Sequence, residues 1–236
     1  MFGLSAAAWA FLILSPSIKG PETGDAVVGA MCINGVLITQ TESVALLQVF
    51  TITNLLGWAV MIVAMMFPTL ISPLTHVAER SFRHKRLGLM SVFLLAYLFI
   101  WSMAGVALMS VSLLLRHILS APYFGLIISM LFIALVWQCS PLKQLCLNRN
   151  HQHPAMRAYG LASYQDAARF GFAHGVWCVG SCWALMLFST VSVVAHQPTM
   201  LLLMFVMLSE SMQVPRPPSW EWRLIPARKL RGLAMR

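Results

Sequence analysis

Apolar runs of membrane-spanning length recur along the chain, separated by polar segments. The runs cover residues 4–18, 51–75, 88–115, 123–139, 171–189 and 199–214. A hydrocarbon core about 30 Å thick is spanned by roughly 20 residues of helix. In lipid every backbone polar group must be paired within the protein, which helices achieve locally. The pattern therefore predicts an all-α fold, a polytopic transmembrane helix bundle of about six spans.

Two of these runs gather their polar and aromatic side chains on one helix face. In 51–75 that face carries Asn54, Trp58, Met61, Met65, Thr69 and Ser72. Because lipid offers such groups no hydrogen bond, we expect the face to turn into the bundle. Pro68 predicts a kink in this helix. In the next run Tyr97, Trp101 and Gly105 recur at steps of four and predict a second inward face.

The segment after the run at 123–139 predicts a short helix outside the bilayer core. Ser140 and Pro141 have the residue types of a helix cap and first helical residue. We expect the side chain of Lys143 to reach the lipid headgroups, and Glu210, near the end of the last run, to be an interfacial carboxylate. Residues 148–170 predict a polar loop.

Charge predicts how the bundle is oriented. Of the 16 Lys and Arg residues, all except Lys19 and Arg116 fall on one side of the predicted spans. Since basic residues stay on the cytoplasmic side, both termini are expected to be cytoplasmic, in a bacterial cytoplasmic (inner) membrane. The predicted domains are an anchor with a mildly acidic external loop, the transmembrane bundle and a basic interfacial cytoplasmic tail. These cover residues 1–50, 51–214 and 215–236. Residues 27–39 are too short to predict a span.

Composition agrees with membrane integration and excludes several function classes. The chain is 59% hydrophobic and 10% charged, whereas soluble domains carry about 25% charged residues. The net charge of +9 comes from loops rather than a binding face, so we expect lipid and membrane subunits as partners and no nucleic acid. The chain has no Gly-rich phosphate loop, Ser/His/Asp arrangement or paired buried carboxylates. We therefore expect no enzyme activity.

The run at 171–189 contains the residues with the clearest chemistry. His174, Cys178 and Cys182 follow one another at four-residue steps and therefore share one helix stripe. Thiol and imidazole side chains on one face are typical ligands of a soft metal ion. A second interpretation stays open, because small residues at this spacing also let membrane helices approach, and buried Cys is a common small hydrophobe.

Depth in the membrane predicts which further sulfur atoms lie near this stripe. At ~1.5 Å per residue, Cys178 lies ~10 Å and Cys182 ~16 Å from the inner start of their helix. Two methionines lie ~13–15 Å from the inner end of theirs, and Cys146 lies at the inner boundary. The candidate ligands in the inner half of the membrane are His174, Cys178, Cys182, Cys146, Met65 and Met66.

This donor set favours copper. Thiolate, imidazole and thioether ligands together suit Cu(I), with zinc as the second choice. A dithiol oxidase is disfavoured, since cysteines one helical turn apart hold their Cβ atoms ~5–6 Å apart, whereas a disulfide needs ~3.8 Å. A metal tolerates the wider spacing because each metal–sulfur bond adds about 2.3 Å.

Four motifs resemble one known family. They are AMMFP at 64–68, AYLFIW at 96–101, PLKQLCL at 141–147 and HGVWCVGSCWALM at 174–186. The chain from Trp58 to Glu210 resembles the predicted metal-binding integral membrane protein family, domain of unknown function 2182. The resemblance implies family positions at Met65, Met66, Pro68, Pro141, Lys143, Cys146, His174, Cys178, Gly180, Cys182, Trp183, Met186 and Glu210. Ser181 departs from the family pattern, which has Cys there, and a further Cys of the pattern is replaced within Asn148 to Asn150.

The residues and the resemblance together predict a copper-handling membrane protein, either a carrier or an accessory subunit that supplies or stabilises a partner. The alternative is a non-catalytic scaffold subunit of a larger membrane complex with no metal site, in which small residues serve helix packing. A small-solute transporter is disfavoured, because the chain shows no repeats and few ionisable residues in its apolar runs.

Overall fold

The computed structural model describes residues 2–14, 52–119, 123–157, 159–191 and 196–220. Within these ranges the chain forms helices and no strand, which confirms the all-α prediction. The elements are α1 (Phe2–Leu14), α4 (Ile52–Met66), the 3-10 helix η1 (Phe67–Leu70), α5 (Ile71–Glu79), α6 (Arg86–Leu119), α7 (Tyr123–Cys139), α8 (Pro141–Asn150), α9 (Gly160–Val191) and α10 (His196–Ser211).

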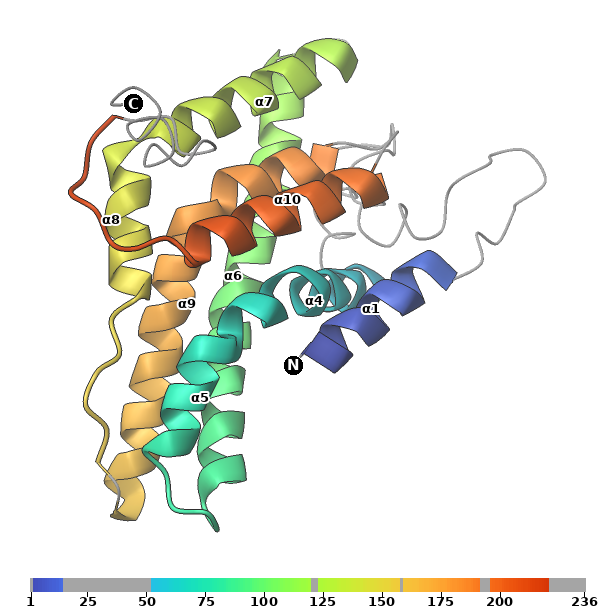
Figure 1. Cartoon of the computed structure of the whole chain (residues 1–236). Helices are drawn as coiled ribbons and strands as arrows, with labels where there is room; N and C mark the ends of the chain where they lie inside the picture. The colour runs from blue at the N-terminus through green and yellow to red at the C-terminus, as the bar shows by residue number, and fades with distance from the viewer. Residues whose placement is uncertain (1, 15–51, 120–122, 158, 192–195, 221–236) are drawn as a thin grey trace, which may run out of the picture.

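Helices α6 and α9 form the long axis of the molecule and make its most extensive helix pair. They contain 34 and 32 residues, so each is about 50 Å long, well beyond the ~30 Å of a hydrocarbon core. Figure 1 shows their first halves packed with α5 at one end, while α1, α4 and α10 cross nearer the other. The long pair therefore extends the helical body past the thickness of one hydrocarbon core.

Helix α9 starts earlier than the sequence predicted. The expected polar loop at 148–170 ends at Gly160, and residues 160–170 are helical. Ser163, Ala167 and Phe170 are buried, which is the i, i+4, i+7 spacing of an amphipathic helix. The loop prediction was wrong here because it counted polar residues without testing the helical period.

Small residues on α9 and α6 allow neighbouring helices to come into contact. A Cβ atom at Gly171 would overlap the backbone carbonyl of Phe93 on α6, and one at Gly105 would overlap the indole of Trp58. That indole Nε1 donates a hydrogen bond to the carbonyl of Trp101, at 3.0 Å. Trp101 and Tyr97 are fully buried, which confirms the predicted inward face of α6.

The two predicted breaks occur where expected. Pro68 lies in the 3-10 turn η1, which joins α4 to α5. Ser140 caps α8, and its hydroxyl accepts a hydrogen bond from the backbone N–H of Leu142 at 3.2 Å. The chain bends by 65° between α7 and α8. Because of this bend α8 packs back against α9.

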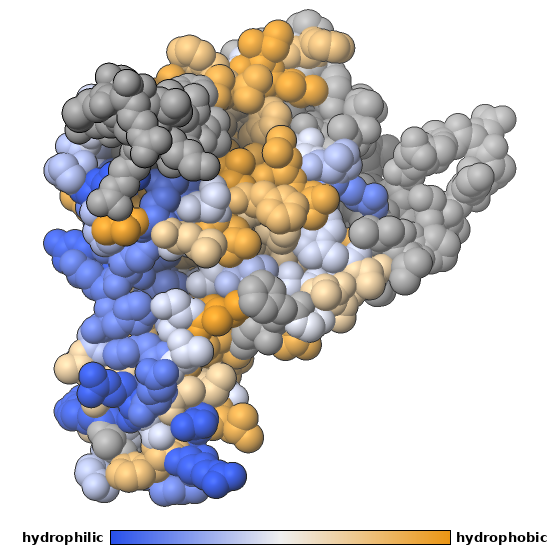
Figure 2. Space-filling view, viewed as in Figure 1, coloured by the Kyte–Doolittle hydropathy of each residue, from blue (hydrophilic) through white to orange (hydrophobic). Residues whose placement is uncertain are grey.

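Three helical segments are long and apolar enough to cross a membrane: Gly57–Glu79, Arg86–Ser112 and Gly160–Thr190. The bent pair Phe124–Cys139 and Pro141–Asn150 adds a fourth if it counts as one span. Figure 2 shows hydrophobic surface over α7 and α10 and hydrophilic surface along the segment after α8. These features are consistent with a membrane protein.

The predicted six spans and the orientation of the termini stay predictions. Much of the expected N-terminal anchor and loop at 1–50, all of 27–39, and most of the basic tail at 215–236 lie outside the described residues. The described part of the tail, up to Trp220, contains no helix beyond residue 211.

The contact at Gly171 predicts a specific sensitivity to added volume. We expect Gly171→Ala to destabilise the protein by about 1–3 kcal/mol, the usual cost of overpacking, because the new methyl meets backbone that cannot move aside. Gly3→Ala is the matched control, since a Cβ at Gly3 meets nothing within 4 Å. Thermal unfolding in detergent, followed by a thiol-reactive dye on the buried cysteines, measures both. Equal melting temperatures for the two variants would show that α6 and α9 do not meet at Gly171.

Candidate metal centre

A cavity of about 20 Å³ lies where α9 meets α8, α10 and the α4–η1 junction. A space of this size holds about one water molecule or one ion. Its wall is formed by Met66, Thr69, Leu147, Asn150, Cys178, Ser181, Cys182, Met207, Glu210 and Ser211. We call it the sulfur cavity, because four of its wall residues carry sulfur.

The two thiols of the sulfur cavity come from consecutive turns of α9. Cys178 and Cys182 are free cysteines, 4% and 3% exposed. The Cys182 thiol donates to the backbone carbonyl of Cys178, with 3.0 Å between Sγ and O. The hydroxyl of Tyr97 on α6 lies 3.3 Å from the Cys178 Sγ. Both thiols are therefore held in place and shielded from solvent.

Two thioethers complete the set of sulfur atoms. Met66, at the end of α4, was predicted from the sequence, whereas Met207 on α10 was not. The sequence does contain a pattern that indicates it. Met200, Met204 and Met207 recur at steps of three and four and are all buried, so α10 presents a methionine stripe to the interior.

The structure brings Met66, Cys178 and Cys182 together but separates the other candidate ligands from them. Met65 is fully buried in the core and is not part of the cavity wall. Cys146 contacts Gly180, which lies on the opposite side of α9 from the two thiols. His174 lies in the wall of a neighbouring cavity.

His, Cys, Asp and Glu alone do not form a site of three or more ligands among the described residues. A soft metal in the sulfur cavity therefore depends on thioether ligands in addition to the two thiols. Thioethers are ligands that select Cu(I).

A buried ion pair borders the sulfur cavity. The Lys143 Nζ lies 2.7 Å from the Glu210 Oε2, and these side chains are 0% and 4% exposed. Gln138 on α7 is hydrogen-bonded to both residues. The prediction that Lys143 reaches the headgroups was wrong, and Glu210, predicted to be an interfacial carboxylate, is buried in this ion pair. The bend at Ser140 turns α8 inward, which takes Lys143 into the protein, and a buried charge needs an opposite partner.

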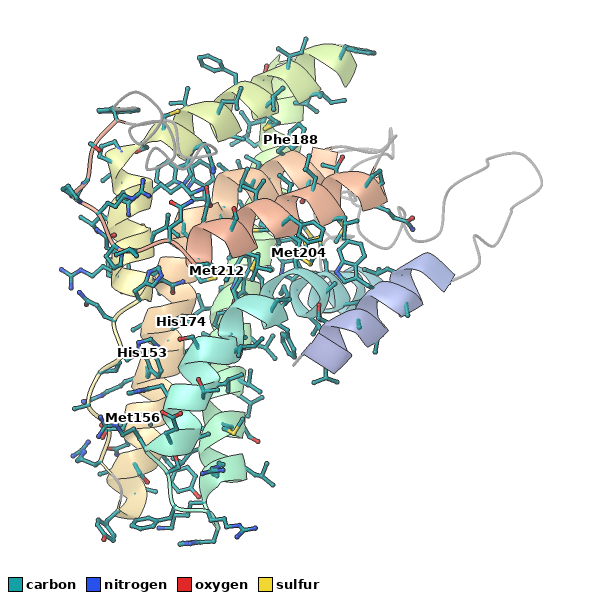
Figure 3. The ribbon with its side chains drawn as sticks, viewed as in Figure 1. His153, Met156, His174, Phe188, Met204 and Met212 are labelled. Carbon is teal, nitrogen blue, oxygen red and sulfur yellow. The ribbon has the colours of Figure 1, made fainter. Side chains whose placement is uncertain are left out.

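A second and larger cavity, of about 370 Å³, opens beside the two turns of α9 that lie immediately before Cys178. We call it the histidine cavity. Its wall is formed by Arg149, Gln152, His153, Pro154, Phe170, Ala173, His174 and Trp177. Figure 3 shows His153, on the segment after α8, a little below His174 on α9. This volume lies within the range of small-molecule sites.

The two histidines of this cavity differ in their surroundings. His174 is 4% exposed, and neither ring nitrogen has a hydrogen-bond partner in the described structure. His153 lies against His76, with ring centroids 4.9 Å apart, and its Nε2 is 3.3 Å from the Ser72 Oγ. Burial, and then the neighbouring His76, lower the pKa of His153. The lowered pKa favours the neutral imidazole, which is the form that binds a metal ion.

The polar loop predicted at 148–170 is not simply solvated where it contains His151 and His153. His151 contacts two backbone carbonyls through its ring nitrogens, that of Leu147 at 2.7 Å and that of Ser211 at 2.9 Å. It therefore ties the end of α8 to the end of α10. His153 is packed against other rings and lines a cavity.

The buried ion pair predicts an asymmetric response to mutation. We expect Lys143→Met alone to destabilise the protein by about 3–5 kcal/mol, because it leaves the Glu210 carboxylate buried and uncompensated. The double variant Lys143→Met/Glu210→Leu should recover most of the loss. Thermal unfolding in detergent measures both. Arg157→Gln is the matched control, since its partner Asp166 forms an exposed pair and such pairs contribute little. A double variant as unstable as the single one would contradict a simple charge-compensation role.

Comparison with known proteins places this geometry in context. The family model PpoB2, described as copper chaperone, matches residues 55–226. The matched range contains the sulfur cavity, the histidine cavity and the buried ion pair. Searches of the curated proteins and of the solved structures gave no match. The match supports a metal-related family, and the narrower resemblance to domain of unknown function 2182 stays a prediction. Because the matched range covers well over half of the chain, the protein belongs to the PpoB2 copper chaperone family.

Proposed function

We propose that the protein is a non-catalytic integral membrane copper carrier whose cargo is Cu(I). The ion is held in the sulfur cavity by Cys178 and Cys182, with Met66 and Met207 as further ligands. The observation that carries this proposal is the cavity wall. Two buried cysteines and two methionines are among the residues that line a space the size of one ion, in a chain of a copper chaperone family.

The chemistry of the four donors favours monovalent copper. Cu(I) is a soft ion that prefers thiolate and thioether sulfur, and zinc is the second choice. Binding replaces the thiol protons, so an empty site holds neutral thiols and loading releases protons. The helix keeps the Cβ atoms of Cys178 and Cys182 ~5–6 Å apart, which a bridging metal tolerates and a disulfide does not.

The ion pair beside the cavity fits a charged cargo. Cu(I) with two thiolates carries one net negative charge, which is costly to bury without compensation. Glu210 lines the cavity, and its ion-pair partner Lys143 holds an ammonium group 2.7 Å from that carboxylate. The charged side chains at the cavity therefore provide an ammonium group near the loaded site.

The carrier lies in the bacterial cytoplasmic membrane with both termini inside, in a bundle of six spans. This orientation places the thiols in the inner half of the membrane, where copper arrives from the cytosol. Its partners are the surrounding lipid and a membrane protein that receives or supplies the metal.

A scaffold subunit without a metal site is the second candidate. The observation in its favour is the packing of small residues on α9 against α6. Gly171 would clash with Phe93 if it had a Cβ, and a Cβ at Gly175 would lie 3.0 Å from the Ile100 Cβ. In this alternative Cys178 and Cys182 are small residues of the same interface.

Copper titration of purified variants tests the carrier. We expect the wild type to bind one Cu(I) per chain in competition with a chelator, with sulfur ligands in X-ray absorption. The variant Cys178→Ser/Cys182→Ser should lose this sulfur-ligated copper. The variant Met66→Leu/Met207→Leu should bind it more weakly, because two neutral ligands are removed while both thiols remain.

Cys139→Ser/Cys146→Ser is the matched control. Neither residue lines the sulfur cavity, so this variant should bind copper as the wild type does. A wild type that takes up neither copper nor zinc at stoichiometric metal would refute the carrier. A Cys178→Ser/Cys182→Ser variant with full function and full partner association would establish the scaffold instead.

A further inference from the structure

The two cavities follow one another along the same side of α9. His174 and Trp177 line the histidine cavity, and Cys178, one residue further, lines the sulfur cavity. The end of α8 lies beside both, since Arg149 belongs to the wall of the first and Asn150 to the wall of the second. A ligand in the histidine cavity therefore lies next to the sulfur cavity.

His174 is the unexplained group in this arrangement. It is 4% exposed, and neither its Nδ1 nor its Nε2 has a partner among the described residues. Its ring is instead surrounded by the aromatic rings of Phe93, Tyr97 and Phe170, with centroids 5.8 to 6.0 Å away. Leaving a buried polar group unpaired costs about 1–3 kcal/mol. A lone imidazole lining a cavity therefore indicates a ligand.

His153 supplies a second nitrogen donor in the same wall. The rings of His153 and His174 both pack against the Phe170 ring, at centroid distances of 6.1 and 5.8 Å, and both residues line this cavity. Arg149 adds a positive charge, held over the Trp177 ring at 5.8 Å. The cavity thus combines two nitrogen donors with one cation in about 370 Å³, more space than a bare metal ion needs.

We propose that the histidine cavity is an intake site that receives Cu(I) as a complex with a small anionic thiol, and this inference rests on the proposed copper cargo. Arg149 binds the anionic group of the incoming thiol. His153 and His174 bind the metal before it moves to Cys178 and Cys182. The histidine cavity is therefore a site distinct from the sulfur cavity.

Transfer through this site is ligand exchange without electron transfer. A copper–nitrogen bond to His174 forms as a copper–sulfur bond to the incoming thiol breaks, and copper stays monovalent. A copper–sulfur bond to Cys178 then replaces the bond to His174. The Cys178 thiol loses one proton and the released thiolate takes up one proton, so the exchange has no net change in bound protons. The two residues are one helical turn apart, about 6 Å along the axis, and Cu(I) prefers sulfur to nitrogen, so the step inward is favourable.

Removing the sulfur site makes the intake site visible. We expect the variant Cys178→Ser/Cys182→Ser, titrated with Cu(I)–glutathione, to retain a weaker copper with nitrogen ligands in X-ray absorption. Mutating a residue that only hydrogen-bonds to a metal ligand already lowers the affinity for the metal by about 10–100-fold. Adding His153→Gln or His174→Gln should therefore weaken this copper by at least about 10-fold. His84→Gln, an exposed histidine away from the cavity, is the matched control and should change nothing.

Loading kinetics test the same site with both thiols present. We expect His174→Gln to slow transfer from Cu(I)–glutathione to the sulfur cavity by about 10-fold or more, with the final copper content unchanged. Arg149→Gln should slow transfer from this anionic carrier but not from Cu(I) bound to uncharged mercaptoethanol. Melting temperatures near the wild-type value show that the variants are folded, and His153→Gln repeats the test at a less buried position.

The outcomes separate this inference from the proposed function. The intake site alone would be overturned by three results together. The wild type binds sulfur-ligated copper, the variant Cys178→Ser/Cys182→Ser binds no copper, and neither His174→Gln nor His153→Gln slows copper transfer. Nitrogen-ligated copper that survives loss of both thiols, with no sulfur ligand in the wild type, would overturn the sulfur cavity and support the intake site. Absence of bound copper from all variants would overturn both.

Discussion

Close packing between α6 and α9 is the constraint on which both cavities depend. The carbonyl of Phe93 lies where a side chain at residue 171 would stand, so only glycine permits this approach. One turn and two turns further along α9, His174 is stacked among the rings of α6 and Cys178 lies 3.3 Å from the Tyr97 hydroxyl. If α6 and α9 lay further apart, the side chains of His174 and Cys178 would be less buried. The small residue therefore sets the burial on which the metal chemistry relies.

The buried ion pair closes the same region from the other side. It joins α8 to α10, and Gln138 connects it to α7. Other described polar ties in this region run from His151 to the carbonyl of Ser211 and from the side chain of Asn148 to the backbone of Arg216, which follows α10. Replacing such a pair by apolar residues is often neutral or stabilising, so stability alone does not account for its presence. In the proposed carrier the site would alternate between neutral thiols and a charged complex, and a charged pair beside it would have an electrostatic role that apolar residues cannot supply.

Sequence reasoning predicted the elements of this fold better than their mutual contacts. Helical period alone identified the inward face of Tyr97 and Trp101 and the cap at Ser140, because both are local properties. Position along the helix axis indicated that the Met66, Cys178 and Cys182 side chains lie near one another, but not toward which side of its helix each side chain points. Met65 and Met66 differ by ~100° around α4, and only Met66 reaches the cavity. Lys143 and His153 gained their positions from the bend after α7 and from contacts across more than 50 residues, which no local pattern contains. The methionine stripe of α10, in contrast, is a local pattern that indicates an inward Met207.

The composition of the sulfur cavity favours a cargo that can leave again. Ser181 lies in its wall between the two cysteines, and its hydroxyl donates to the Cys178 carbonyl at 2.7 Å. A thiol at this position would add a third thiolate and hold soft metal more tightly. Two thiolates with two neutral thioethers bind Cu(I) through fewer charged ligands, and each thioether bond can open without taking up a proton. Under the proposed function, ligand exchange would therefore be accessible at the sulfur cavity, which a carrier needs and a permanent structural metal site does not.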